Sequence, residues 1–287
     1  MNKIGFIGVG IMGKGMVHNL LKNGFEVHIY ARNRQKVEET VAEGAKFHAT
    51  IAECVKGCEA VITMVGFPQD VEEVYFKQGN IFDSADPNTY LIDMTTTSPT
   101  LAEKLFSEGT KRGFRVMDAP VTGGDTGARN GTLSILAGGE KADFEACVPV
   151  FKAMGNNINY QGTAGCGQHA KLANQIMVAG ALSGVCEALA YAEKKGLDLN
   201  VLFTSVSTGA AGSSQLNAFG PKIIAGDYQP GFFLKHIIKD MKLAKEEAEN
   251  SGLTLGMINQ VLGEYLELES EGKGNLGTQA LIQYYRK

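Results

Sequence analysis

KIGFIGVGIMGKGMVHNLLKNGFEVHIYARNR, residues 3–34, is the stretch of this 287-residue chain that decides its fold. Residues 4–7 form a short apolar run of the kind found in buried parallel strands. A glycine-rich turn follows, then a helical stretch over 11–22, and then a second strand over 26–30. This order predicts a βαβ unit at the start of an α/β domain.

The turn of this unit has the spacing Gly8-x-Gly10-x-x-Gly13. The first glycine allows a tight turn, the second lets a pyrophosphate approach the backbone, and the third lets the helix pack closely on the strand. The helix that begins with Ile11 and Met12 directs its N-terminal N–H groups and the positive end of its dipole at the same point. A glycine turn in this context predicts a dinucleotide site, against the alternative of a purely structural turn.

The end of the second strand indicates which dinucleotide is bound. An enzyme for NAD usually has Asp or Glu about 20 residues after the glycines, where it binds the ribose 2′-OH. This chain reads Ala31-Arg32-Asn33-Arg34 there and has no acidic residue before Glu38. Arginine gives a 2′-phosphate a charge-assisted, often bidentate partner. We therefore predict NADP(H), bound mainly by Arg32 with help from Asn33 or Arg34; NAD(H), with Arg32 on a solvated turn, is the alternative.

Composition describes an ordinary globular chain long enough for two domains. Hydrophobic residues make up 44 %, charged residues 20 %, and the net charge is −4 without long charged runs, so neither nucleic acid nor an anionic membrane is expected as a partner. The N-terminus runs straight into the first strand, and the longest apolar run, 176–186, is shorter than the ~18 residues of a membrane span. Five scattered cysteines fit free thiols in a reducing compartment, and no cluster suggests a metal site. We expect a cytoplasmic protein.

Strands and helices alternate along the first half of the chain. Strands are expected over 44–47, 60–65, 90–94 and 115–119, with helices over 35–43, 51–56, 70–75 and 101–112. This alternation continues to about residue 162 and predicts a mostly parallel, doubly wound sheet. Residues 1–162 are therefore predicted to form a Rossmann-type dinucleotide-binding domain.

The second half of the chain, 163–287, has helical patterns only. Residues 166–195 contain no proline and few glycines, which predicts a single helix of about 30 residues that joins the two domains. Further helices are expected over 201–208, 214–225, 233–250, 255–270 and 277–285. A helix so long and so apolar needs several neighbours to bury it, so we expect an all-helical domain for substrate binding and association into a homodimer or homotetramer.

Three further stretches carry chemistry. After the strand at 115–119, Thr122-Gly123-Gly124 offers a hydroxyl and successive backbone N–H groups, which can form a nest for a carboxylate; a plain turn is the alternative. Lys171 and Asn174 lie three residues apart on one helix face among apolar residues, where a desolvated lysine has a lowered pKa and can move protons; a lysine that extends to solvent is the alternative. Lys239-Asp240 lies on an amphipathic helix.

Four ordered motifs, GFIGVGIMGKGM, DAPVTGG, GCGQHAKLANQ and KHIIKDM, resemble the β-hydroxyacid dehydrogenase family over essentially the whole chain. That family includes 3-hydroxyisobutyrate dehydrogenase, tartronate semialdehyde reductase, the glyoxylate/succinic semialdehyde reductases and 6-phosphogluconate dehydrogenase. The resemblance implies an NAD(P)-dependent oxidoreductase that transfers hydride between nicotinamide and a small hydroxy acid or semialdehyde. We do not expect 6-phosphogluconate dehydrogenase itself, because the sequence lacks the much larger helical domain of that enzyme.

The resemblance also implies roles for individual residues. Lys171 is expected to be the general acid/base, and Asn174 or Gln175 is expected to orient the substrate oxygen. The implied cofactor contacts are Gly8, Gly10, Ile11, Met12, Gly13, Met64, Val65, Thr96, Lys239 and Asp240, and the implied substrate contacts are Thr122, Gly123, Gly124, Gln175 and Lys239.

Two positions depart from the usual family pattern. Thr122 stands where the family usually has Ser, and Gln175 stands where many members have a second Asn, so the motifs leave the substrate open. An imine reductase on the same scaffold and a non-catalytic dinucleotide-binding protein are the alternatives. Both replace or lose the catalytic lysine, so Lys171 counts against them.

Overall fold

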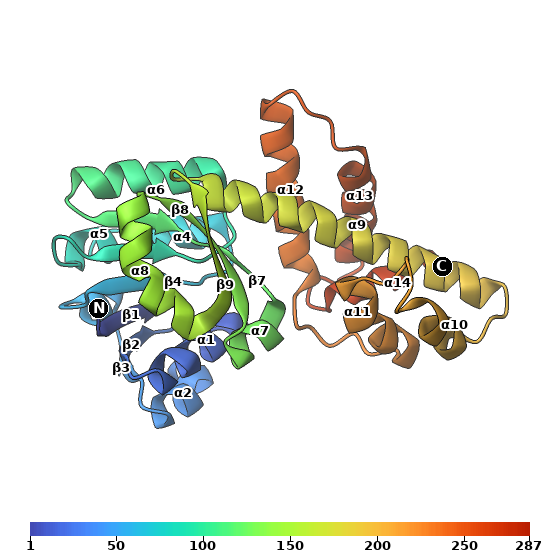
Figure 1. Cartoon of the computed structure of the whole chain (residues 1–287), viewed down its shortest axis with the longest axis horizontal. Helices are drawn as coiled ribbons and strands as arrows, with labels where there is room; N and C mark the ends of the chain where they lie inside the picture. Colours follow the sequence, from blue (N-terminus) through green and yellow to red (C-terminus); the bar gives the residue numbers. More distant parts are fainter. The chain divides into compact units, whose positions relative to one another are not determined.

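The computed structural model describes all residues from Met1 to Lys287. The chain forms two compact units, Met1–Lys171 and Leu172–Lys287. Helix α9 (Cys166–Lys194) begins in the first unit and continues into the second, so it joins them as one unbroken element (Figure 1). The two units meet after Lys171, within α9. The boundary between two folding domains after residue 162 stays a prediction.

The first unit is built around one nine-stranded sheet with the order β3-β2-β1-β4-β5-β6-β8-β7, in which β9 pairs with β8. The order from β3 to β6 is that of doubly wound dinucleotide-binding folds, with the reversal of strand order between β1 and β4. The strands are β1 (Lys3–Ile7), β2 (Glu26–Tyr30), β3 (Lys46–His48), β4 (Ala60–Thr63), β5 (Tyr90–Asp93), β6 (Arg115–Asp118), β7 (Val121–Thr122), β8 (Leu133–Gly139) and β9 (Gly155–Gly162).

The sheet is parallel from β3 to β6, as the alternating pattern predicts, but not beyond. Strand β8 runs antiparallel to both β6 and β7, and β9 is parallel to β8. The connection from β7 to β8 contains one short helix, α7 (Gly124–Asn130), which lets the chain turn back beside β7 instead of crossing over the sheet. The sequence patterns did not predict this antiparallel edge.

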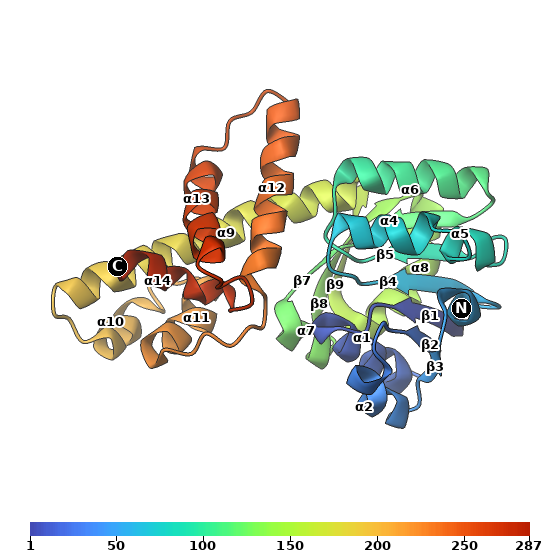
Figure 2. The same ribbon diagram turned by 180° about the vertical axis from the view of Figure 1, so that it is seen from behind.

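Helices cover both faces of the sheet (Figure 1 and Figure 2). One face packs against α1 (Ile11–Lys22), α7 and α8 (Lys141–Met154), and the other against α3 (Ile51–Val55), α4 (Pro68–Phe76), α5 (Ile81–Ser84) and α6 (Pro99–Lys111). Alternate strand residues enter opposite cores, because side chains along a strand point to opposite faces: Phe6 contacts the first layer and Ile7 the second. A 3₁₀ helix, η1 (Arg34–Val37), and α2 (Glu38–Ala42) follow β2.

The second unit is all helical, as predicted. Its helices are the rest of α9, α10 (Leu199–Val206), α11 (Ser214–Ala225), α12 (Leu234–Asn250), α13 (Gly256–Ser270), the 3₁₀ helix η2 (Thr278–Leu281) and α14 (Ile282–Tyr285). A single isolated bridge joins Phe233 to Gly277. The core contains fully buried Tyr265, whose hydroxyl donates to the Thr278 carbonyl oxygen at 2.9 Å, so η2 is held against α13.

By length and composition alone, α9 is long and apolar enough to cross a membrane, which the short apolar run at 176–186 did not indicate. The core helix of a globular protein meets the same criteria. The middle of α9 contributes Leu182, Cys186 and Leu189 to the core of the second unit. Its apolar character is therefore used in packing among α11, α12 and α13.

Candidate active site

The glycine turn after β1 has the tight geometry that its spacing predicts. Gly8 has a φ of +100°, and a Cβ there would lie 2.2 Å from the Met64 carbonyl oxygen. A Cβ on Gly13 would lie 2.2 Å from the Gly8 carbonyl oxygen, so α1 packs directly on the turn. The Gly8 N–H donates to the Tyr30 carbonyl oxygen at 3.2 Å. The turn therefore crosses the carboxyl ends of β2 and β4, where doubly wound folds bind their ligands.

Gly10 differs from these two glycines, because a Cβ there would meet nothing within 4 Å. Gly10 is also the N-cap of α1, and no side chain caps that helix. Ile11, the first helical residue, is 43 % exposed, and Met12 is half-buried. An open approach to an uncapped helix N-terminus fits a dinucleotide diphosphate, which would supply both the volume and the negative charge.

The three polar residues after β2 have different partners. The Asn33 side chain accepts from the Gln35 N–H at 2.9 Å and so caps η1. The Arg34 guanidinium stacks over the Phe47 ring, 5.4 Å from its centroid. Arg32 is 69 % exposed and forms an ion pair with Asp70, which raises the pKa of the guanidinium. Each of the three side chains therefore has a partner within the protein: a carboxylate for Arg32, a backbone N–H for Asn33 and an aromatic ring for Arg34.

Asp70 is a residue that the sequence analysis missed. One of its carboxylate oxygens binds Arg32, and the other accepts from the Phe67 N–H at 3.1 Å at the start of α4. Its position in the first turn of a helix was visible in the sequence, but its approach to Arg32 was not, because 38 residues separate the two.

The ends of β4 and β5 are joined by buried polar contacts. The Val65 N–H donates to the Thr95 hydroxyl at 3.0 Å, and the Met64 N–H donates to the Ile7 carbonyl oxygen at 2.8 Å. Asp93 accepts from the Thr63 hydroxyl at 2.7 Å and from the Thr95 N–H at 3.1 Å. Burial of Asp93 raises the pKa of its carboxyl to about 6 despite these hydrogen bonds. The predicted residues Met64, Val65 and half-buried Thr96 thus lie on adjacent, mutually anchored loops.

The predicted carboxylate site lies where β7 ends. Thr122 is the last residue of β7, and Gly123 and Gly124 follow with φ of +129° and +63°. Both glycines are exposed and Thr122 is half-buried. A Cβ on Gly124 would meet nothing within 4 Å, so the site is open to a small ligand on that side. Glycine is needed at both positions because side chains rarely adopt a positive φ.

A second anchored site, also missed by the sequence analysis, lies at the start of α9. Both oxygens of Asp118, at the end of β6, accept backbone N–H groups: Gly165 at 2.8 Å and Gln168 at 2.8 Å. The Gln168 side chain donates to the Thr95 carbonyl oxygen at 2.8 Å and accepts from the Thr97 N–H at 3.0 Å. We call the set Thr63, Val65, Asp93, Thr95, Thr97, Asp118, Gly165 and Gln168 the carboxyl-end network.

Lys171 lies one turn after Gln168 in α9 and is only 7 % exposed. The alternative of a lysine extended into solvent does not fit this burial. The short distance from Lys171 to the carboxyl-end network along α9 places the lysine at the carboxyl end of the sheet, where the glycine turn also lies.

In the second unit, the predicted residues form a chain of contacts. The Asn174 amide donates to the Gln175 side-chain oxygen at 2.8 Å, and the Gln175 amide donates to Asp240 at 2.6 Å. The other Asp240 oxygen binds the Lys239 ammonium at 2.9 Å. Gln175 and Asp240 are buried, Lys239 is 13 % exposed at its side chain, and Asn174 is half-buried. This series of contacts joins α9 to α12 and orients the Asn174 amide.

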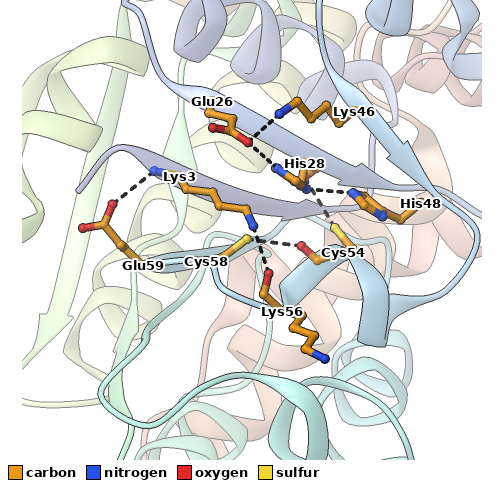
Figure 3. Close-up of polar contacts among 9 residues, drawn as sticks. All are labelled: Lys3, Glu26, His28, Lys46, His48, Cys54, Lys56, Cys58 and Glu59. Carbon is orange, nitrogen blue, oxygen red and sulfur yellow. Dashed lines mark hydrogen bonds and ion pairs between the residues drawn. The ribbon is translucent and has the colours of Figure 1, made fainter.

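A different polar cluster lies along β2 and β3, from Glu26 and Lys46 at the first positions of the two strands to His48 at the last position of β3 (Figure 3). Glu26 accepts from the Lys46 ammonium at 2.6 Å and from His28 at 2.8 Å, and the His28 and His48 rings are hydrogen-bonded at 2.7 Å and stacked. Lys46 and His28 lower the pKa of the Glu26 carboxyl to about 2. We call Glu26, His28, Lys46 and His48 the amino-end cluster.

The amino-end cluster does not have the arrangement of a metal site. No group of three or more His, Cys, Asp or Glu side chains in the chain is placed to hold a metal ion. Cys54 and Cys58 lie beside the cluster with their thiols against backbone carbonyl oxygens, and both are buried and free (Figure 3). Ligand sites in open α/β sheets lie at the carboxyl ends of the strands, whereas the ion pair of this cluster joins Glu26 and Lys46, the first residues of β2 and β3.

The chain matches two families over nearly its whole length. Residues 3–162 match the NAD binding domain of 6-phosphogluconate dehydrogenase, and residues 165–285 match the NAD-binding domain of NADP-dependent 3-hydroxyisobutyrate dehydrogenase.

Individual relatives cover the chain from end to end. An uncharacterised oxidoreductase of Bacillus subtilis, YkwC, is 46 % identical and covers 99 % of both chains. Glyoxylate/succinic semialdehyde reductase 1 of Arabidopsis thaliana is 33 % identical, covering 98 % of this chain and 97 % of its own. An NAD-dependent L-serine dehydrogenase of Pseudomonas aeruginosa is also 33 % identical, covering 95 % and 94 %.

Solved structures agree in fold. A 3-hydroxyisobutyrate dehydrogenase of Salmonella typhimurium superposes with a TM-score of 0.92 at 25 % identity and covers 99 % of both chains. The Mycobacterium tuberculosis 3-hydroxyisobutyrate dehydrogenase with L-serine superposes with a TM-score of 0.89 at 28 % identity and covers 100 % of both.

Proposed function

This chain belongs to the β-hydroxyacid dehydrogenase family and is an NAD(P)-dependent oxidoreductase of the hydroxyacid dehydrogenase type, and we propose that it interconverts a small hydroxy acid and its semialdehyde with NADP(H), using Lys171 as general acid/base. The observation that carries the proposal is the burial of Lys171 on α9, beside an anchored network at the carboxyl end of the sheet. A lysine that is buried beside a ligand site can serve as a general acid/base, because its pKa shifts readily when it is desolvated.

The proposed roles follow from the chemistry of the side chains. The nicotinamide, when bound, supplies hydride to the aldehyde carbon or takes it from the alcohol. Lys171, as ammonium, donates a proton to the developing alkoxide oxygen in reduction and, as amine, accepts the hydroxyl proton in oxidation. Loss of such a proton transfer costs roughly 10²–10⁴-fold in rate.

Binding and orientation of the substrate are assigned to two other groups. Thr122, Gly123 and Gly124 present a hydroxyl and backbone N–H groups suited to a carboxylate. Asn174, whose amide is oriented by Gln175, is suited to bind the substrate oxygen. Asp240 holds the Lys239 ammonium by an ion pair, so that a cation is available to an anionic substrate or cofactor group.

The preference for NADP(H) rests on Arg32. It is an exposed arginine after β2, in the place where NAD enzymes usually have an acid. Arg32→Ala should raise the KM for NADPH by about 10–100-fold, the value of one charge-assisted hydrogen bond, and change the KM for NADH little. Arg112→Ala is the matched control, because Arg112 is also a part-exposed arginine that pairs with a carboxylate, that of Asp83, and stacks over a ring, that of Phe82, but it is not an expected cofactor contact, so both constants should stay near wild type. A wild-type preference for NADH would contradict the proposal.

The substrate class is tested by steady-state turnover on a panel. Glyoxylate, succinic semialdehyde, tartronate semialdehyde and methylmalonate semialdehyde are tested in reduction. L-serine and 3-hydroxyisobutyrate are tested in oxidation, because L-serine is the substrate named for one relative. Each is run with wild type, Lys171→Ala and Lys171→Arg. Turnover by wild type that falls at least ~10²-fold in Lys171→Ala is the expected result. Cofactor binding without turnover of any acid would favour the imine reductase or non-catalytic alternative.

We also propose that the chain forms a homodimer or homotetramer through the second unit. Large apolar side chains are exposed there at Met177, Tyr191, Leu197 and Val201, with 52–67 % of their surface accessible. Exposed apolar side chains concentrated on one unit favour a protein interface. Light scattering on wild type and Tyr191→Lys tests the proposal: a monomeric wild type would overturn it, and a shift of the variant toward monomer would support it.

A further inference from the structure

We propose that Gln168 is a positioning residue, which holds the first turn of α9, and with it Lys171, in a set register against the loop after β5. The inference rests on the proposed role of Lys171. Gln168 is fully buried, and its side-chain amide meets the backbone at two points. Its Nε2 donates to the Thr95 carbonyl oxygen at 2.8 Å and its Oε1 accepts from the Thr97 N–H at 3.0 Å.

The side-chain amide of Gln168 donates to one backbone carbonyl oxygen and accepts from one backbone N–H, as a residue of a neighbouring β-strand does, and these two hydrogen bonds fix its orientation. An amide that rotated would place like groups against each other at both contacts, so only one orientation satisfies them. Both contacts go to backbone atoms, which cannot move aside as a side chain can. Gln168 thereby joins α9 to a loop from which it is separated by 71 and 73 residues in sequence.

The backbone of Gln168 is held as firmly as its side chain. Its N–H, at the start of α9 where no helical partner exists, donates to Asp118 at 2.8 Å, and the Gly165 N–H donates to the second oxygen of Asp118. A Cβ on the intervening Gly167 would lie 2.4 Å from the Leu136 carbonyl oxygen, so the helix start lies directly on β8. The first turn of α9 therefore has little freedom to slide or rotate.

Lys171 follows Gln168 by three residues, which places both on one side of the helix. The loop that Gln168 holds also carries Thr96, between its two anchored neighbours, and its Thr95 hydroxyl accepts from the Val65 N–H. Gln168 is thus a direct link between the proposed acid/base and the loops proposed to face the nicotinamide. Because a displacement of about 1 Å can cost about 10²-fold in rate, this link bears on kcat.

The test compares two substitutions of Gln168. Gln168→Met keeps the length of the side chain and removes both hydrogen bonds. Gln168→Glu keeps an acceptor for the Thr97 N–H but, when ionised, loses the donor to the Thr95 carbonyl oxygen. Protonation of this glutamate restores the donor. We expect kcat per folded molecule to fall about 10–100-fold in Gln168→Met, with the Kd for NADPH within about 3-fold of wild type.

The matched control is Gln279→Met in the second unit. Gln279 is also fully buried, and its amide donates to the Asp227 and Gln229 carbonyl oxygens at 3.1 Å. Both Met variants should lose stability by similar amounts, but only Gln168→Met should lose kcat. A Gln168→Met kcat within about 2-fold of wild type, or equal kcat losses in the two variants, would overturn the proposal.

The pH profile gives an independent readout. The ratio of Gln168→Glu to wild-type kcat should rise as the pH falls, because the protonated share of the glutamate rises. A ratio that stays far below one even at the lowest pH would show that a restored donor to Thr95 does not restore kcat, and it would also overturn the proposal. If Lys171 is not the acid/base, Lys171→Ala keeps its turnover. This result distinguishes failure of the proposed function from failure of the proposed role of Gln168.

Discussion

The first unit carries two polar groups of residues on one sheet, and they are built from different chemistry. The carboxyl-end network is buried, and most of its contacts join a side chain to a backbone group of another element, as Gln168 does with Thr95. The amino-end cluster is formed by charged and aromatic side chains that bind one another, with Lys46 and Glu26 reaching solvent (Figure 3). A backbone contact of a buried side chain fixes geometry, whereas an exposed ion pair is weak and adaptable. We infer that the carboxyl-end network sets the geometry of the site and that the amino-end cluster does not.

The largest difference is expected when one carboxylate is removed from each group. Asp118→Asn keeps one acceptor and turns an amide NH₂ toward a backbone N–H of α9, which leaves a buried donor without a partner. We expect the free energy of unfolding to fall by about 2–3 kcal/mol, measured by urea denaturation. Glu26→Gln, an equally small change, should lower the Tm by about 2 °C or less, because Glu26 is exposed and its ion pair is screened. Equal losses in the two variants would refute the contrast.

Two glycines of α9 extend the same contrast along one helix. Gly167→Ala places a Cβ 2.4 Å from the Leu136 carbonyl oxygen and should cost about 1–3 kcal/mol. Gly184 is exposed, and a Cβ there meets nothing within 4 Å. Gly184→Ala should therefore raise stability by about 0.5–1 kcal/mol, the difference between the two residues within a helix. Denaturation curves of both variants check the opposite signs, and a loss in Gly184→Ala would show that a partner subunit packs on this site.

The titration of His48 in the amino-end cluster should contribute to the pH dependence of the protein's stability. Burial, together with the charge of His28, lowers the pKa of His48 from its usual value of 6.5. The unfolded chain then binds more protons below pH 6.5 than the folded protein does, so this contribution to stability is complete above pH 6.5 and is lost as the pH falls. His48→Gln should flatten the fall in Tm between about pH 7.5 and 5.5 by roughly 2 °C or less. Asp93, with a pKa raised to about 6, acts in the opposite direction in both proteins and cancels in the comparison.

The smallest effect is expected at the thiols beside the amino-end cluster. Burial raises the pKa of Cys54 to about 12 and that of Cys58 to about 11, so neither thiolate is populated near neutral pH. Iodoacetamide at about pH 8 should leave both unmodified in the native protein and label both in guanidinium chloride, as read by mass spectrometry. Rapid labelling of native Cys54 or Cys58 would show that the amino ends of the strands open in solution.

Sequence patterns were sufficient for features that depend on neighbouring residues. The βαβ unit, the three glycines of the first turn and the helices over 214–225 and 166–194 follow from local apolar periodicity and from conformations that only glycine adopts. The family motifs also identified the chain as an NAD(P)-dependent oxidoreductase, which the comparisons with known proteins confirm. Each of these signals lies within a few residues of the feature that it predicts.

Contacts between distant segments were decided by the tertiary structure alone. Asp70 meets Arg32 across 38 residues, Asp118 caps α9 across 47, and Gln168 reaches Thr95 across 73. The antiparallel pairing of β8 with β6 and β7 was likewise decided by the tertiary structure and not by a local sequence pattern. An aspartate or glutamine looks the same in sequence whether its partner is water or a distant backbone group, because only packing removes the water and leaves one partner within reach. The sequence by itself predicted which chemical groups form the site, and the folded chain decided which of these side chains hold others in place.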